Sequence, residues 1–199
     1  SQLHKKKKLK IFFWFRKNFF TKDWIYSFNQ KDIGEIVYFS CPDPGVKPEV
    51  FDIDIKKKFN FTIIKKPFLH KKEYLELIKD TDVYICPRKQ EGIGMSFLEA
   101  LSMGKYIVAN DDSTMNEYVT NNKIGFLINE NIKNKVDIKK IRKFKNYRIE
   151  NSKLLFEKWS LDKVKIINFF RKKSSNKSRS ILTETIFISD FLKKLKFKI

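Results

Sequence analysis

Short apolar runs alternate with helical patterns from residue 10 to residue 128, and no other feature constrains the fold as strongly. Six runs have the length of buried strands: Lys10–Phe15, Glu35–Cys41, Phe61–Ile64, Val83–Cys86, Tyr106–Ala109 and Gly125–Ile128. Helical patterns fall between them: Thr21–Asn29, Lys71–Lys79, Phe97–Met103 with Gly104 as its C-cap, and a helix from about Met115. Parallel strands need such crossovers, and strands this apolar are typical of a sheet buried on both faces. The pattern predicts an α/β fold, with helices on both faces of a Rossmann-like parallel sheet.

The character of the sequence changes after residue 130. Residues 133–171 are charged and then helical in pattern, whereas residues 172–180 (KKSSNKSRS) are typical of a flexible linker. The last segment places apolar side chains on one helical face and gathers lysines at its end. We predict a basic leader over 1–9, a Rossmann-like domain over 10–132, C-terminal helices over 133–171, and a linker with a basic amphipathic tail over 172–199.

The chain is strongly basic, with 43 Lys and Arg against 23 Asp and Glu and a net charge of +20. This balance suits a polyanionic partner: nucleic acid, an anionic membrane or a phosphorylated small molecule. A general preference for Lys, Ile, Asn and Phe, as an AT-rich genome would produce, explains the charge as well, so both explanations stay open. No nucleic-acid-binding motif is present, and we expect no nucleic acid partner.

Cysteine content and hydropathy bear on the compartment. Cys41 and Cys86 lie in apolar runs without metal-ligand spacing, as expected of reduced thiols in the cytoplasm. No stretch approaches the roughly 20 apolar residues of a membrane-spanning helix. We therefore expect a cytoplasmic protein, peripheral on the inner face of the cytoplasmic membrane if its basic tail binds lipid. The first residue is Ser1 rather than Met, so we expect a piece of a longer protein.

The stretch EGIGMSFLEA, from Glu91 to Ala100, carries the clearest chemical signal. It links a strand to a helix, and the free N–H groups of a helix N-terminus favour an anion such as a diphosphate. Gly92 and Gly94 permit a tight turn close to a ligand. The carboxylates of Glu91 and Glu99 suit sugar hydroxyls, so the combination predicts a site for a nucleotide-diphosphate sugar. A helix cap offers an alternative, because Ser96-x-x-Glu99 has the form of a capping box.

The segment from Asp82 to Ile128 resembles the C-terminal, donor-binding domain of group 1 retaining GT-B glycosyltransferases. The resemblance extends more weakly over about residues 10–170, with the KWSLDKV stretch similar to the start of the family's terminal helix. The residues that match the family's pattern in order are Glu91, Gly92, Gly94, Glu99, Ala100, Gly104, Glu117 and Gly125.

The resemblance assigns roles to individual residues. Glu91 would be the catalytic residue and would hold hydroxyls of the donor sugar near the reaction centre. Glu99 would hold the ribose hydroxyls of the nucleotide. Backbone amides around Gly94, Met95 and Ser96 would face the diphosphate and the sugar. Three further substrate-binding residues are implied: Arg16 and Lys22 as cations on the diphosphate, and Leu69 in a loop that contacts the base.

The family also implies an activity, the transfer of a hexose with retention to a saccharide or lipid-linked acceptor in cell-surface polysaccharide or lipopolysaccharide biosynthesis. It implies no metal and no cofactor besides the nucleotide-sugar donor. Because the N-terminal acceptor domain of a GT-B enzyme is absent, we expect an incomplete enzyme that needs this domain or a partner chain. A truncated non-catalytic remnant or scaffold, and a charge-driven membrane or nucleic-acid binder, stay open as alternatives.

Overall fold

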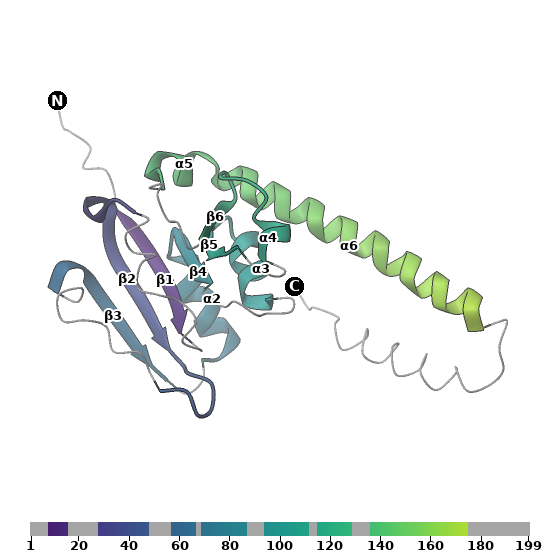
Figure 1. Ribbon diagram of the computed structural model, residues 1–199, viewed down its shortest axis with the longest axis horizontal. Coiled ribbons are helices and arrows are strands. Elements are labelled where there is room, and N and C mark those ends of the chain that lie inside the picture. Colours follow the sequence, from purple (N-terminus) through teal and green to yellow (C-terminus); the bar gives the residue numbers. More distant parts are fainter. Residues whose placement is uncertain are drawn as a thin grey trace. The chain divides into compact units, whose positions relative to one another are not determined.

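The computed structural model describes residues 8–15, 28–47, 57–66, 69–86, 94–111, 115–128 and 136–174. The chain divides into two compact units, Ser1–Ser152 and Lys153–Ile199. The first unit holds the sheet and its covering helices (Figure 1). The described part of the second unit is the continuation of helix α6, which runs over Lys145–Ser174.

Six parallel strands form one sheet in the order β3-β2-β1-β4-β5-β6. The strand order reverses between β1 and β4, which is the doubly wound arrangement of dinucleotide-binding domains. The fold class predicted from the alternating runs is therefore confirmed. The strands are β1 Leu9–Phe15, β2 Ile33–Ser40, β3 Asn60–Lys65, β4 Val83–Cys86, β5 Tyr106–Asn110 and β6 Gly125–Ile128.

Helices connect the strands at the places where the sequence predicts them. After β3 comes α2 (Lys71–Lys79), after β4 comes α3 (Met95–Ser102), and after β5 comes the single turn α4 (Met115–Tyr118). A short 3-10 turn, η2 (Gln30–Asp32), precedes β2. The helix predicted at Thr21–Asn29 lies almost entirely outside the described residues.

Both faces of the sheet are covered. On one face, Ile11 and Phe13 of β1 belong to a buried cluster that includes Val136 and Ile141, the latter from helix α5 (Ile138–Lys143). On the other face, Phe12 stacks on Tyr84 of β4, with ring centroids 5.6 Å apart.

Helix α2 reaches the second face through Tyr74, whose ring lies 5.3 Å from that of Trp14. Phe97 of α3 packs edge-on against Tyr118 of α4 on the same side. Burial of these large rings is worth on the order of 2 kcal/mol each, so the aromatic content supplies the core rather than a stacking surface.

The edge strand β3 departs from the expected burial. Four of its six residues are exposed and two are half-buried, and Ile63 is 39% exposed. The apolar run Phe61–Ile64 predicts a strand buried on both faces, and that expectation is wrong here. Position explains the difference, because β3 lies at the end of the sheet order and pairs with β2 alone within the described residues.

Gly104 ends α3 as predicted. Its φ of +72° follows the C-cap residue Met103, and its N–H donates to the carbonyl of Leu101 over 2.9 Å. A Cβ at this position would lie 2.9 Å from Cγ1 of Ile149 and 3.0 Å from the carbonyl oxygen of Lys145. Both conformation and space therefore require glycine.

Arg148 is buried and holds three separate segments together. Its guanidinium donates to the carbonyls of Gly104 (2.8 Å), Lys123 (3.0 Å) and Ile141 (2.5 Å). The same group lies over the ring of Tyr106, 5.7 Å from its centroid. The start of α6 is thereby fixed to the beginning of β5 within the first unit.

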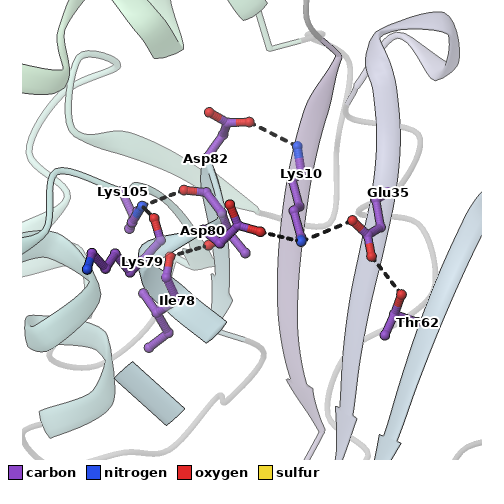
Figure 2. Close-up of polar contacts among 9 residues, drawn as sticks. Lys10, Glu35, Thr62, Ile78, Lys79, Asp80, Asp82 and Lys105 are labelled. Carbon is purple, nitrogen blue, oxygen red and sulfur yellow. Dashed lines mark hydrogen bonds and ion pairs between the residues drawn. The ribbon is translucent and has the colours of Figure 1, made fainter. Parts of the chain in front are cut away.

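A polar network lies at the amino ends of the strands. Figure 2 shows Lys10 of β1, whose ammonium pairs with Asp80 at 2.6 Å and Glu35 at 3.1 Å. Glu35 accepts a further hydrogen bond from Thr62 of β3, and Asp82 accepts one from the backbone N–H of Lys10. These contacts align four neighbouring strands, and we assign them a structural role.

Candidate functional site

In folds with this strand order, ligands bind at the carboxyl edge of the sheet, near the point between β1 and β4 where the order reverses. Helix N-termini lie at the same edge and favour anions. Strand β4 ends at Cys86, and α3 begins at Met95. Strand β3 ends at Lys65, and α2 begins at Lys71. The starts of α2 and α3 are linked by direct side-chain contacts.

The first turn of α3 is built around Gly94 and Ser96. Gly94 is the N-cap residue, buried and extended, and among the described residues no side-chain cap hydrogen bond is seen at this helix. The hydroxyl of Tyr84 donates to Oγ of Ser96 over 3.0 Å, and the hydroxyl of Tyr74 donates to the Ser96 carbonyl over 3.3 Å. Two tyrosines therefore fix the first turn of α3, whose backbone N–H groups have no acceptor within the helix.

The capping-box alternative for Ser96-x-x-Glu99 is wrong. Ser96 lies inside the helix, one residue past its start, and its side chain bonds to Tyr84. The Glu99 carboxylate pairs with another helix, since its Oε1 lies 3.0 Å from Nζ of Lys71 in α2. Glu99 therefore does not cap α3, and its carboxylate is held by Lys71 of α2.

The ion pair joins two side chains of unequal exposure. The Glu99 side chain is 22% exposed and that of Lys71 is 62% exposed. A carboxylate at partial burial with an oriented oxygen is suited to accept hydrogen bonds from vicinal hydroxyls. Sequence reasoning missed Lys71, although a lysine at the first position of a predicted helix was a usable signal, because it opposes the helix dipole.

Leu69 lies beside this arrangement. It is buried, and it precedes His70, the N-cap residue of α2, and Lys71. The structure thus places five of the predicted site residues at the starts of α2 and α3: Leu69, Gly94, Met95, Ser96 and Glu99. Three others, Arg16, Lys22 and Glu91, lie outside the described residues.

Three large pKa shifts belong to the opposite, amino edge of the sheet. Burial lowers the pKa of Lys105 to about 8, and its ammonium donates to the carbonyls of Lys79 and Thr81. Burial likewise raises the pKa of Tyr106 to about 12 and lowers that of Arg148 to about 10. These groups are satisfied structural contacts, and they do not mark the site.

Among the described residues, no group of three His, Cys, Asp or Glu side chains is arranged to hold a metal ion. Within the same part of the chain, no helix has both the length and the apolar content that crossing a bilayer requires.

A family model described as glycosyl transferases group 1 matches residues 55–154. Strand order, helix placement and this match define the class of protein as a Rossmann-like half of a GT-B fold. The chain belongs to the group 1 glycosyltransferase family, and the part that it covers fits the C-terminal domain of such proteins.

Solved structures show the same fold. The C-terminal domain of a group 1 glycosyl transferase (LpcC) from Francisella tularensis is similar over 76% of this chain and 86% of its own, with 18% identity and a TM-score of 0.52. A mutant of TarM from S. aureus, in complex with fondaparinux, alpha-GlcNAc-glycerol and UDP, is similar over 80% of this chain and 36% of its own, with 16% identity and a TM-score of 0.51.

WaaG, a glycosyltransferase involved in lipopolysaccharide biosynthesis, is similar over 74% of this chain and 42% of its own, with 15% identity and a TM-score of 0.48. The chain therefore spans less than half the length of the WaaG and TarM chains that it matches. No curated protein sequence matches it.

Proposed function

We propose that this chain is the donor-binding domain of a retaining glycosyltransferase and that it binds a nucleotide-diphosphate sugar at the carboxyl edge of its sheet. The observation that carries the proposal is the position of Glu99: a partly buried carboxylate on α3, oriented by Lys71 at the start of α2. Membership of the group 1 family agrees with this function.

The chemistry divides between the two ends of the donor. Glu99 accepts hydrogen bonds from ribose hydroxyls, and the segment before Lys71, with Leu69, lies against the base. The first-turn amides of α3, after Gly94, face the diphosphate, where the positive end of the helix dipole favours negative charge. Ser96 serves this turn by locking it to Tyr84 and Tyr74.

Arg16, Lys22 and Glu91 complete the proposed site, although their placement is outside the described residues. The two cations offset the charge that develops on the departing nucleoside diphosphate, which is how preorganised charges lower such a barrier. Glu91 holds hydroxyls of the hexose near the reacting carbon. The donor is a substrate, and the proposal needs no metal or further cofactor.

The complete enzyme also needs a domain that binds the acceptor on the other side of the donor site. We infer that an N-terminal GT-B domain, in the same chain or in a partner, binds a saccharide or lipid-linked acceptor. The transferred hexose then enters a cell-surface polysaccharide or lipopolysaccharide. A cytoplasmic location fits the supply of nucleotide sugars.

The basic tail predicted to bind an anionic membrane face lies outside the described residues. The described helix of the second unit also supports such an association. This helix carries basic side chains, among them Lys158 and Lys163, between exposed apolar ones. Lysines beside aromatic and aliphatic groups bind anionic lipid through both charge and burial. In the described part of the second unit, the exposed large apolar residues are Leu154, Phe156, Trp159, Leu161, Val164, Ile166 and Phe169.

Nucleoside diphosphate binding tests the proposed function. Calorimetry of the 199-residue chain with UDP, GDP, ADP and CDP is expected to show binding of at least one of them. Glu99→Gln keeps the shape of the side chain and removes its charge, and Glu76→Gln is the matched control on an exposed position of α2. A folded chain that binds none of the four would contradict the proposal and favour a non-catalytic scaffold.

A further inference from the structure

We propose that Lys71 is a positioning residue for ribose recognition: it holds one oxygen of the Glu99 carboxylate so that the other oxygen faces the ribose diol. The inference rests on the proposed function and adds a residue that family membership does not assign. Lys71 acts through Glu99 and need not touch the donor itself.

The geometry of the pair supports this role. Nζ of Lys71 lies 3.0 Å from Oε1 of Glu99, within the range of a charge-assisted hydrogen bond. A carboxylate has two oxygens and about four acceptor sites, so engagement of Oε1 leaves Oε2 available to hydroxyl donors. With Oε1 held, the plane of the carboxylate is fixed, and a diol meets an oriented acceptor instead of a rotating one.

A second contact joins α2 to α3 close to the Lys71–Glu99 ion pair. The Tyr74 hydroxyl, one turn after Lys71 on α2, donates to the carbonyl of Ser96 on α3. Glu99 lies one turn after Ser96 on α3. A hydrogen bond and an ion pair therefore join α2 to α3. The ion pair links Lys71 to Glu99, the residue that we propose binds the ribose.

Lys71 also occupies a position that local helix energetics disfavour. It is the first residue of α2, where the positive end of the helix dipole repels a cation. An acidic residue would suit this position better, as Glu73 in the same turn does. Local rules are broken most often at functional sites, and here the unfavourable lysine points at the carboxylate that we assign to the ribose.

A purely structural bridge is the alternative, and the chain offers a matched pair for comparison. Lys66 Nζ lies 3.5 Å from Oε1 of Glu73 at the start of the same helix. Both of its members are about half exposed, at 53% and 48%, whereas Glu99 is only 22% exposed. Lys66→Met removes the same charge from the same region without touching Glu99.

The experiment measures discrimination between ribose and deoxyribose. The affinity of the 199-residue chain is measured for the tightest-binding of UDP, GDP, ADP and CDP and for its 2′-deoxy form. We expect the wild-type chain to prefer the ribose form and Glu99→Gln to lose most of that preference. Lys71→Met is expected to lower the preference by about two- to fivefold, which is the scale of a partly exposed ion pair.

Three further variants test whether Lys71 acts by orienting Glu99, and not through net charge or through the stability of the fold. Lys71→Arg restores a cationic donor and is expected to regain at least half of the lost preference. Lys66→Met is expected to keep the wild-type preference. The double variant Lys71→Met with Glu99→Gln is expected to match Glu99→Gln alone, because both act on one interaction. Thermal unfolding of each variant confirms that the chain is folded.

The outcomes distinguish this inference from the proposed function. If Glu99→Gln loses the preference while Lys71→Met keeps it, the positioning role is wrong and the donor site stands. Equal weakening of both nucleotide forms by Lys71→Met and Lys66→Met would also overturn the role, since it would reflect net charge. If the wild-type chain binds none of the four diphosphates, the proposed function fails and this inference fails with it.

Discussion

The guanidinium Nε of Arg148 donates to the carbonyl of Gly104 over 2.8 Å, across 44 positions of the sequence. Through this bond the first turn of α6 is fixed to the turn that ends α3, and α3 carries Glu99. The geometry of the proposed donor site therefore depends on a buried cation that lies far from it in the sequence.

Replacement of Arg148 by Met is expected to lower the free energy of unfolding by about 3 kcal/mol or more, because three carbonyls, two of them in buried hydrogen bonds, lose a charged donor. Urea unfolding followed by circular dichroism measures the change. Arg142→Met, on an exposed position of α5, is the control and is expected to change stability by less than about 0.5 kcal/mol. A similar loss in both variants would contradict the role of Arg148.

Gly104→Ala is expected to destabilise the chain by about 2 kcal/mol, through backbone strain and the close approach of Ile149 and Lys145. Gly45→Ala isolates the first cause, because Gly45 also has a positive φ but no atom within 4 Å of an added Cβ. We expect the control to lose about 1 kcal/mol. The difference between the two unfolding free energies measures the packing at Gly104, and its absence would argue against that packing.

Stability is expected to rise between about pH 8 and pH 10. The pKa of Lys105 is about 8 in the folded chain, below its ordinary 10.5, so the unfolded chain binds more protons in this interval. The free energy of unfolding then increases with pH, by at most about 1.4 kcal/mol per unit. The shifts of Tyr106 and Arg148 act mainly above pH 10.

Lys105→Met removes the titrating group and is expected to flatten this slope. Urea unfolding of both proteins at half-unit steps of pH gives the comparison. The variant also loses the bonds to the carbonyls of Lys79 and Thr81, so the slope and not the absolute stability carries the test. A slope that is unchanged in the variant would show that another group is responsible.

Vesicle binding tests the proposed role of the second unit. Co-sedimentation with vesicles rich in phosphatidylglycerol is expected to exceed that with pure phosphatidylcholine and to fall at high salt. Replacing Lys158 and Lys163 by Gln is expected to weaken binding by about fivefold per lysine. The matched change at Lys139 and Lys140 of α5 is expected to have a smaller effect, and an equal effect would point to net charge alone.

Much of the fold follows from local pattern, as α2 and β4 illustrate. The helix predicted over Lys71–Lys79 and the strand predicted over Val83–Cys86 have the same bounds in the structure. Periodicity and apolar runs suffice for these elements because the burial of their side chains follows a local pattern. Burial of β3 was not predictable in this way, since a strand's position in the sheet is set by long-range pairing.

The candidate site divides similarly. Gly94 and Glu99 are predicted as site residues from the strand–loop–helix pattern, because a glycine and an acid at that spacing have a local chemical meaning, and their role stays a prediction. The partner of Glu99 was not found, because Lys71 is 28 positions away and belongs to another helix. A charged partner brought together by packing leaves no periodic signal in one sequence.

Binding of nucleoside diphosphates to the wild-type chain and to Glu99→Gln tests the central claim most directly. The account predicts measurable binding by the wild type and a loss of about ten- to a hundredfold in Glu99→Gln, the scale of hydrogen bonds to a charged group. Glu76→Gln is predicted to bind as the wild type does. Equal affinity of the wild type and Glu99→Gln, with both chains folded, would contradict the assignment of this edge as the donor site.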